Sequence, residues 1–206
     1  MKFVMFVEGP TEKEVLGPFL GGWLNKRLSN RVGIQTVKFG GWPRMVEDMA
    51  LRAHMHLNAP DASKVVAVIA LLDLYGPDFY PASTSQVDER IEWATEHLQD
   101  KVRNKKFRVF FAVHEIEAWL LSQPSRFPTA VRKVLPSTQP EEVNFDKPPS
   151  KRLSDIYMRE LNRSYRKTTD GKNLFAKLDS DVAYEKCPYL RKMLDEMLRI
   201  AKESGL

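Results

Sequence analysis

Short apolar runs alternate with amphipathic stretches over the first 120 residues of the chain. Four runs are rich in β-branched and aromatic residues, which predicts strands. They are residues 2–7, 32–37, 64–72 and 107–113. Between them, apolar residues recur at helical spacing, which predicts three helices. These are residues 11–29, 43–57 and 87–98. The alternating order predicts an α/β domain with a mostly parallel sheet flanked by helices.

The chain changes character after residue 121. Six prolines lie within residues 122–150, which predicts an extended loop with one or two helical turns. Short helices are predicted at residues 151–162 and 189–203. We therefore expect a core over residues 1–121. Residues 122–206 are expected to form an appendage of loops and helices that packs on this core.

Composition narrows the class of protein. Of 206 residues, 43% are hydrophobic and 29% are charged, which excludes a disordered tail, a collagen and a coiled-coil rod. The longest apolar run, residues 65–72, is far shorter than the roughly 20 residues of a membrane span, so no membrane partner is expected. The single cysteine, Cys187, cannot form an internal disulfide, and we expect a reducing cytoplasm.

Charge is divided unevenly along the chain. Residues 1–100 carry 10 Lys and Arg against 13 Asp and Glu, whereas residues 101–206 carry 22 against 14. A basic second half favours an anionic partner, although a well-solvated surface would have the same composition.

Acidic residues follow three of the predicted strands. Glu8 comes after the first strand, Asp73 after the third, and Glu115 and Glu117 after the fourth. In a parallel sheet these ends meet at one edge, where ligands bind. Clustered carboxylates repel one another, and a shared Mg²⁺ would relieve this repulsion. Each acid also has a simpler interpretation, as a helix-start carboxylate, a turn residue or a solvated side chain.

Several motifs occur in order over nearly the whole chain. They are Val7-Glu8-Gly9-Pro10-Thr11-Glu12, Leu72-Asp73-Leu74-Tyr75-Gly76 with Asp78-Phe79-Tyr80-Pro81, His114-Glu115-Ile116-Glu117-Ala118-Trp119-Leu120, Pro149-Ser150-Lys151-Arg152-Leu153, Tyr165-Arg166-Lys167 with Asp170-Gly171, and Cys187-Pro188. The chain thereby resembles a bacterial family of standalone TOPRIM-like proteins, known as a domain of unknown function. This family is related to the TOPRIM nucleases of the overcoming-lysogenisation-defect (OLD) class.

The resemblance implies a site that binds Mg²⁺ or Mn²⁺. Glu8 matches the TOPRIM glutamate, and Asp73 matches the first acid of the Asp-x-Asp motif. Tyr75 stands where the second acid is expected, so Asp78, or Glu115 and Glu117, would complete the metal ligands. Glu117 is favoured over Glu115. The residues expected to be catalytic are Glu8, Asp73 and Glu117.

Eight basic residues lie within residues 147–172, with Tyr157 and Tyr165 among them. Such a mixture is typical of segments that bind a phosphate backbone or an unstacked base. Those expected to contact nucleic acid are Lys151, Arg152, Arg166 and Lys167. The alternative is a solvated helix surface.

Two functions remain open. The first is a TOPRIM-type nuclease or related phosphotransferase that acts on DNA or RNA. The resemblance implies that it works beside an ATPase partner in bacterial defence. The second is a non-catalytic module that binds nucleic acid or an ATPase and whose metal site is degraded. Tyr75, in place of an acid, favours this second function. Under either function the chain could form a homo-oligomer.

Overall fold

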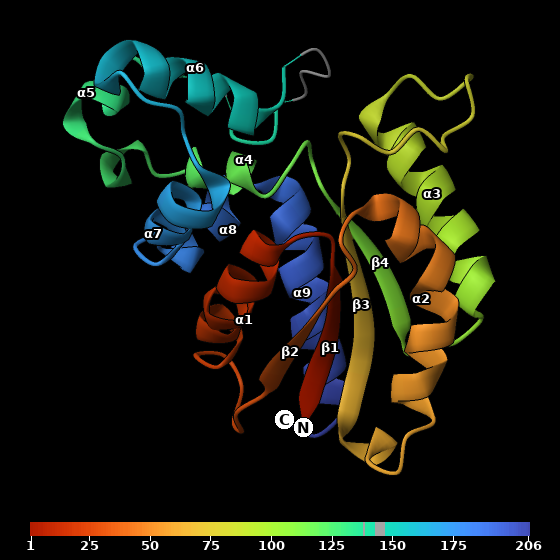
Figure 1. Cartoon of the computed structure of the whole chain (residues 1–206). Coiled ribbons are helices and arrows are strands. Elements are labelled where there is room, and N and C mark those ends of the chain that lie inside the picture. Colours follow the sequence, from red (N-terminus) through yellow and green to blue (C-terminus); the bar gives the residue numbers. More distant parts are fainter. Residues whose placement is uncertain (138, 143–146) are drawn as a thin grey trace.

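The computed structural model describes residues 1–137, 139–142 and 147–206. Within these residues, a four-stranded sheet has the order β2-β1-β3-β4, and all neighbouring strands are parallel. The strands are β1 (Lys2–Val7), β2 (Gly33–Lys38), β3 (Val65–Asp73) and β4 (Phe107–Ala112). The predicted fold class, a parallel sheet flanked by helices, is confirmed (Figure 1).

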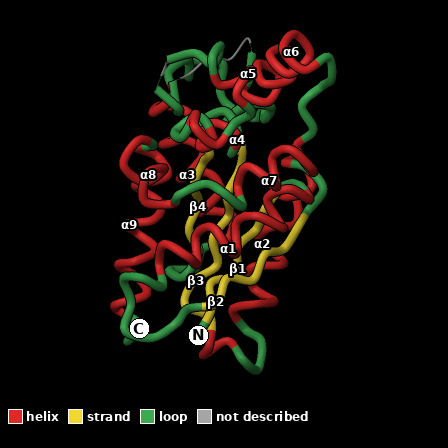
Figure 2. The backbone as a smooth tube through the Cα atoms, turned by 90° about the vertical axis from the view of Figure 1, so that its left-hand side faces the viewer, coloured by secondary structure: helices red, strands yellow, loops and turns green. Residues whose placement is uncertain are grey.

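Two helices cover each face of the sheet. Helices α1 (Pro10–Leu24) and α9 (Pro188–Glu203) lie on one face, and α2 (Trp42–Leu57) and α3 (Val87–Val102) lie on the other (Figures 1 and 2). Side chains of β1 alternate between the two: Phe3 and Met5 join the first cluster, and Val4 and Phe6 join the second. The sheet is thus buried on both sides, as the apolar run of β3 predicts.

Among the described residues between β4 and α9, the chain forms five helices. They are α4 (Glu117–Leu120), α5 (Thr129–Arg132), α6 (Pro149–Leu161), α7 (Lys172–Phe175) and α8 (Ser180–Lys186). In Figure 1, α4, α5 and α6 lie above the carboxyl ends of the strands. Residues 1–112 therefore supply the four strands, and the helices α4, α5 and α6 form a roof over one end of the sheet.

The buried acid Glu141, which the sequence analysis did not single out, connects this roof to the helix α9 that packs on the sheet. Glu141 accepts hydrogen bonds from the backbone N–H groups of Tyr189 (2.7 Å) and Leu190 (3.2 Å) at the start of α9. It also accepts one from the indole Nε1 of Trp119 in α4, at 3.1 Å. One carboxylate thus joins the loop after α5, the helix α4 and the helix α9.

Some predicted boundaries are wrong. The helix predicted for residues 11–29 ends at Leu24, because Asn25 turns away and bonds with the backbone N–H and C=O of Val32. The loop predicted for residues 122–150 does contain one or two helical turns, as expected: α5 and a short 3₁₀ turn, Pro124–Arg126. Its residues 138 and 143–146 lie outside the described residues. Helices α6 and α9 begin at prolines, two residues and one residue before the predicted starts.

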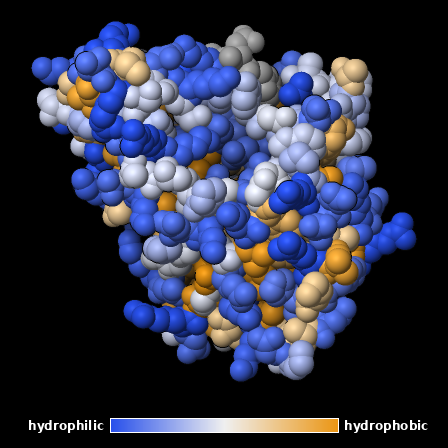
Figure 3. Space-filling view, viewed as in Figure 1, coloured by the Kyte–Doolittle hydropathy of each residue, from blue (hydrophilic) through white to orange (hydrophobic). Residues whose placement is uncertain are grey.

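Hydrophilic residues cover most of the face shown in Figure 3. Across the described part of the chain, no helix combines the length and the apolar character that crossing a bilayer requires.

Candidate functional site

Glu8 begins the site at the end of β1. Its Oε1 accepts a hydrogen bond from the backbone N–H of Asp73, 2.8 Å away, at the end of β3. The Glu8 carbonyl accepts hydrogen bonds from the N–H groups of Gly40 (2.8 Å) and Gly41 (3.0 Å), which follow β2. These two residues have φ values of +85° and +121°, which favour glycine. The ends of β1, β2 and β3 are thus joined through one glutamate.

Glu12 is a further acid of this site that the sequence analysis missed. It lies in the first turn of α1 and is buried. A Cβ atom on Gly9 would lie only 2.7 Å from Glu12 Oε2, so the glycine permits the close approach of this carboxylate. Glu12 adds negative charge near Glu8 and Asp73. The motif Glu8-Gly9-Pro10-Thr11-Glu12 contains this glutamate, but in the sequence alone it cannot be told from a first-turn carboxylate that only favours the helix dipole.

A turn after β4 delivers Glu115 and Glu117. His114 has a φ of +67°, a conformation uncommon for a residue with a side chain, and it is buried. Its carbonyl accepts a hydrogen bond from the Tyr75 N–H at 3.1 Å, and its Nε2 lies 3.1 Å from the Glu142 carbonyl oxygen. The chain therefore turns sharply, and both glutamates are buried.

Lys167 is the cation that these two glutamates share. It opens a single π-helical turn, Lys167–Gly171, and its Nζ lies 2.8 Å from Glu115 Oε1 and 3.3 Å from Glu117 Oε2. The second oxygen of Glu115 accepts a hydrogen bond from the Ser150 N–H at the start of α6, at 3.0 Å. Both oxygens of Glu115 therefore have partners: Lys167 in the π-helical turn and the Ser150 N–H at the start of α6.

Glu117 differs from Glu115 in its bonding. Its side chain is 1% exposed, and among the described residues its only charged partner is the Lys167 ammonium, 3.3 Å from Oε2, a contact that lacks good hydrogen-bond geometry. A buried carboxylate without donors is costly unless a cation compensates it. Glu117 is thus the better candidate for a metal ligand, and Glu115 is better suited to bracing the site.

The pKa values of Glu8, Asp73 and Glu117 are all raised, mainly by burial and further by neighbouring acids. Burial raises the pKa of Glu8 to about 7, and nearby Glu12 adds to the effect. Burial also raises the pKa of Glu117 to about 7, although Lys167 opposes the shift. The pKa of Asp73 is raised well above its usual value by burial and then by Glu8 and Glu12.

Lys167 responds in the opposite direction. Burial alone would lower its pKa, but the charges of Glu117, Glu115 and Asp73 outweigh burial and raise it. One ammonium group therefore interacts with acids from β3 and from the turn after β4.

Two tyrosines border the acids. The Tyr80 hydroxyl is buried, and burial raises its pKa, with Glu8 and Asp73 contributing further. The Tyr165 hydroxyl is also buried, and its pKa is raised by burial and then by Glu117. A Cβ atom on Gly171 would lie 2.6 Å from the Tyr165 hydroxyl, so this glycine leaves room for the ring. Both phenols stay protonated at neutral pH and can act only as neutral hydrogen-bonding groups.

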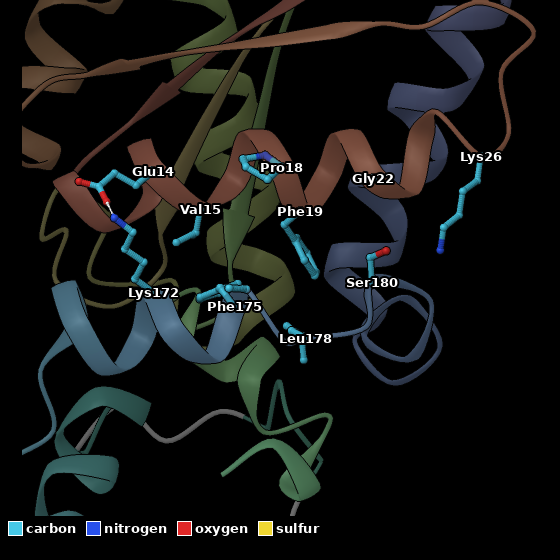
Figure 4. A pocket seen from close by; sticks show the side chains of 11 residues that line it. Glu14, Val15, Pro18, Phe19, Gly22, Lys26, Lys172, Phe175, Leu178 and Ser180 are labelled. Carbon is cyan, nitrogen blue, oxygen red and sulfur yellow. Dashed lines mark ion pairs between the residues drawn. The ribbon is translucent and has the colours of Figure 1, made fainter. Parts of the chain in front are cut away.

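Glu8, Glu12 and Asp73 open onto a cleft with a volume of about 420 Å³. Its walls include Glu8, Glu12 and Asp73, with Lys38 and Lys167 as cations. A second hollow of about 360 Å³ lies between α1 and α7, with Phe19, Phe175 and Leu178 on its walls (Figure 4). The acids of the sheet edge do not line this second hollow, so the 420 Å³ cleft is the candidate site.

Among the remaining predicted residues, only Lys167 contacts the acids directly in the described part of the chain. Asp78 is exposed in the loop after β3, and no interaction among the described residues links it to the other acids. Lys151 is exposed and Arg152 is half-buried in the first turn of α6. Arg166 is exposed beside the π-turn. Lys167, predicted to contact nucleic acid, instead lies against the carboxylates.

The carboxylates suit Mg²⁺ or Mn²⁺ in chemistry, since these ions prefer oxygen ligands. The weakly partnered oxygens of Glu117 and the raised pKa values of Glu8 and Asp73 fit a site with more carboxylates than cations. Among the described residues, however, no three acidic, histidine or cysteine side chains form a ready-made cage for an ion. Metal binding by Glu8, Asp73, Asp78, Glu115 and Glu117 stays a prediction.

Comparison with known families identifies the chain. The family described as Domain of unknown function (DUF4276) matches residues 7–198. The chain belongs to this family. The predicted membership of an uncharacterised family is thereby confirmed, and no curated protein matches this DUF4276 member significantly.

Two solved structures resemble this DUF4276 member. One is the C-terminal region of the OLD protein of Burkholderia pseudomallei, with a TM-score of 0.47, 18% identity, and coverage of 96% of this chain and 97% of that one. The other is the C-terminal region of the OLD protein of Xanthomonas campestris pv. campestris, with a TM-score of 0.46, 21% identity, and coverage of 99% and 98%. Such distant similarity leaves function to be inferred from the site itself.

Proposed function

We propose that the chain is a divalent-metal-dependent nuclease, or a related phosphotransferase, that acts on nucleic acid. The observation that carries this proposal is the hydrogen bond from the Asp73 N–H to Glu8 in a cleft that Lys167 also lines, with Lys167 paired to Glu117 and the pKa of all three acids raised. Acids with raised pKa values in a cleft are typical of catalytic and metal-binding sites.

The acids have distinct proposed roles. Asp73 and Glu117 hold the ion, and Glu115 supports Glu117 by fixing Lys167 and the start of α6. When bound, Mg²⁺ or Mn²⁺ supplies Lewis-acid polarisation of the phosphodiester. With a pKa of about 7, a Glu8 carboxylate oxygen can accept a proton from the attacking water near neutral pH. Asp78 is proposed as a supporting acid from the loop after β3.

Nucleic acid is the proposed substrate because cations border the acids. The Ser150 N–H bonds to Glu115, so Lys151 and Arg152, the next two residues, lie in the turn of α6 that is fixed to the site. Lys38 lines the cleft, and Arg166 is exposed beside the π-turn. Phosphates that flank the scissile bond would be neutralised by such a border.

Cleavage of labelled DNA and RNA in the presence of Mg²⁺ or Mn²⁺ tests the proposal. Glu8→Gln should lower the rate about 100-fold or more, the usual size of a lost acid–base group. The matched control is Glu14→Gln, which removes an exposed acid of the following helix α1 that pairs with Lys172 outside the cleft. Cleavage by Glu8→Gln at the control's rate would remove Glu8 from the proposed machinery.

A non-catalytic nucleic-acid-binding or ATPase-partner module is the second candidate. Tyr75 stands in place of an acid, and the described residues form no ready-made cage. Calorimetric titration separates the two candidates: heat of binding with Mg²⁺ or Mn²⁺ below about 10 mM supports the enzyme, because Mg²⁺ sites built from few carboxylates are weak. Its absence, with nucleic-acid binding retained, supports the module.

The resemblance supports further proposals about cellular context. We propose a cytoplasmic protein of bacterial defence that works with an ATPase. Co-purification of the ATPase with a tagged chain from its native host tests this partnership, and a chain that is recovered alone, as a monomer or a homo-oligomer, would contradict it.

A further inference from the structure

We infer that the Lys167 ammonium is the resident counter-cation of the carboxylate site and that a divalent metal ion displaces it. This inference rests on the proposed function, since it concerns the same site. It assigns to Lys167 a role in setting metal affinity.

The geometry places Lys167 where a cation is needed. Its Nζ lies 2.8 Å from Glu115 and 3.3 Å from Glu117, and within the described residues these are the only ion pairs that either glutamate makes. Lys167 also lines the cleft with Glu8 and Asp73. A single ammonium therefore lies among acids from β1, β3 and the turn after β4.

The charge balance shows why a divalent ion would replace the Lys167 ammonium. An ammonium carries one positive charge and three donors, and it bonds with ideal geometry only to Glu115. The 1%-exposed Glu117 has only the longer ion pair with Lys167, at 3.3 Å, and among the described residues no hydrogen bond of good geometry reaches its oxygens. A divalent ion brings twice the charge and accepts several carboxylate oxygens. Two cations a few ångströms apart repel each other, so the bound metal expels the ammonium.

The local structure lets the side chain leave without unfolding its segment. Asp170 fixes the π-turn through a two-point contact with Arg163 (2.8 Å for each bond) and through the Arg166 N–H at 2.9 Å. The Lys167 side chain is 36% exposed, and the adjacent Thr168 lines the cleft. Rotation about the flexible lysine stem is therefore enough to move the ammonium into solvent.

Chemical labelling of the wild-type protein tests the exchange directly. An amine-acetylating reagent is applied briefly with EDTA or with Mg²⁺, and acetylation of each lysine is measured by peptide mass spectrometry. Mg²⁺ should increase the labelling of Lys167 several-fold. Lys172, which pairs with Glu14 at 2.6 Å on the far side of α1 (Figure 4), should label equally in both conditions. Unchanged or reduced labelling of Lys167 in Mg²⁺ would overturn the inference.

Metal affinity provides a second test with a different readout. Lys167→Met removes the charge and keeps an unbranched side chain, and it should tighten Mn²⁺ binding about tenfold, because a competing cation is gone. Electron paramagnetic resonance of free Mn²⁺ measures the affinity, and Lys172→Met is the control with equal loss of charge. Equal or weaker binding by Lys167→Met would overturn the exchange.

The two proposals fail in different ways. If wild-type protein binds Mn²⁺ and Lys167→Met binds it no more tightly, the exchange is wrong and the metal-dependent function stands. If neither protein binds Mn²⁺ at millimolar concentration, the proposed metal-dependent function falls and the exchange falls with it. If Lys167→Met does not fold, the labelling of wild-type protein still decides the question.

Discussion

Glu117→Gln is expected to stabilise the metal-free protein at alkaline pH. The side chain is 1% exposed, and burial raises its pKa from 4.5 to about 7. Because the folded pKa is above the unfolded pKa, the stability linked to this carboxyl is complete below pH 4.5 and is lost as the pH rises through about 7. The difference amounts to about 3 kcal/mol. Glutamine cannot ionise, so the variant keeps this stability.

Urea unfolding in EDTA measures the effect. At about pH 8, a gain of about 3 kcal/mol should raise the midpoint by about 1 M. At about pH 5 the native wild-type side chain is mostly neutral, and the two midpoints should nearly coincide. Glu14→Gln, which removes an exposed acid of α1, should gain no stability. If Glu117→Gln is no more stable than wild type at about pH 8, ionisation of the buried Glu117 does not destabilise the fold and the reasoning is refuted.

Two further predictions concern the backbone and the basic border. Gly41→Ala should lower the free energy of unfolding by about 1–3 kcal/mol, since φ is +121° there. Gly22 is an exposed position of α1, and no atom lies near an added Cβ, so Gly22→Ala should raise this free energy by about 0.5–1 kcal/mol. Thermal unfolding measures both variants. A loss of stability in Gly22→Ala would contradict the argument. Lys151→Ala should reduce the salt dependence of DNA binding by about one phosphate contact, as fluorescence anisotropy measures, whereas Lys101→Ala at the end of α3 should not. Equal slopes for both variants would remove Lys151 from the proposed border.

The four strands could be predicted because each is a short run of apolar residues with clear flanks. The apolar run of β3 also indicated a parallel sheet. Residues 163–186 have no such pattern, and their short helices α7 and α8 depend on tertiary contacts instead. Phe175, for example, packs edge-on against Phe19 of α1 with 5.7 Å between ring centroids. Contacts of this kind cannot be read from local periodicity.

The site was partly visible in the sequence. Acids at strand ends indicated where Glu8 and Asp73 would meet, and the Asp73 N–H indeed bonds to Glu8. The positive φ of His114 could not be predicted, and this turn lets both Glu115 and Glu117 reach Lys167. Basic composition alone cannot tell a lysine that meets phosphate from one that neutralises acids. Only the fold distinguishes Lys167 from Lys151.

The strand order has a consequence for how the protein folds during synthesis. β1 is an inner strand, and its partner β3 begins about 60 residues later, so the central pairing waits for a long stretch of chain. The acids of three strand ends then meet well before Lys167 leaves the ribosome. A nascent sheet would carry crowded negative charge with Lys38 but without Lys167 to offset it. The last third of the chain therefore completes the electrostatics of the fold, and the site matures late.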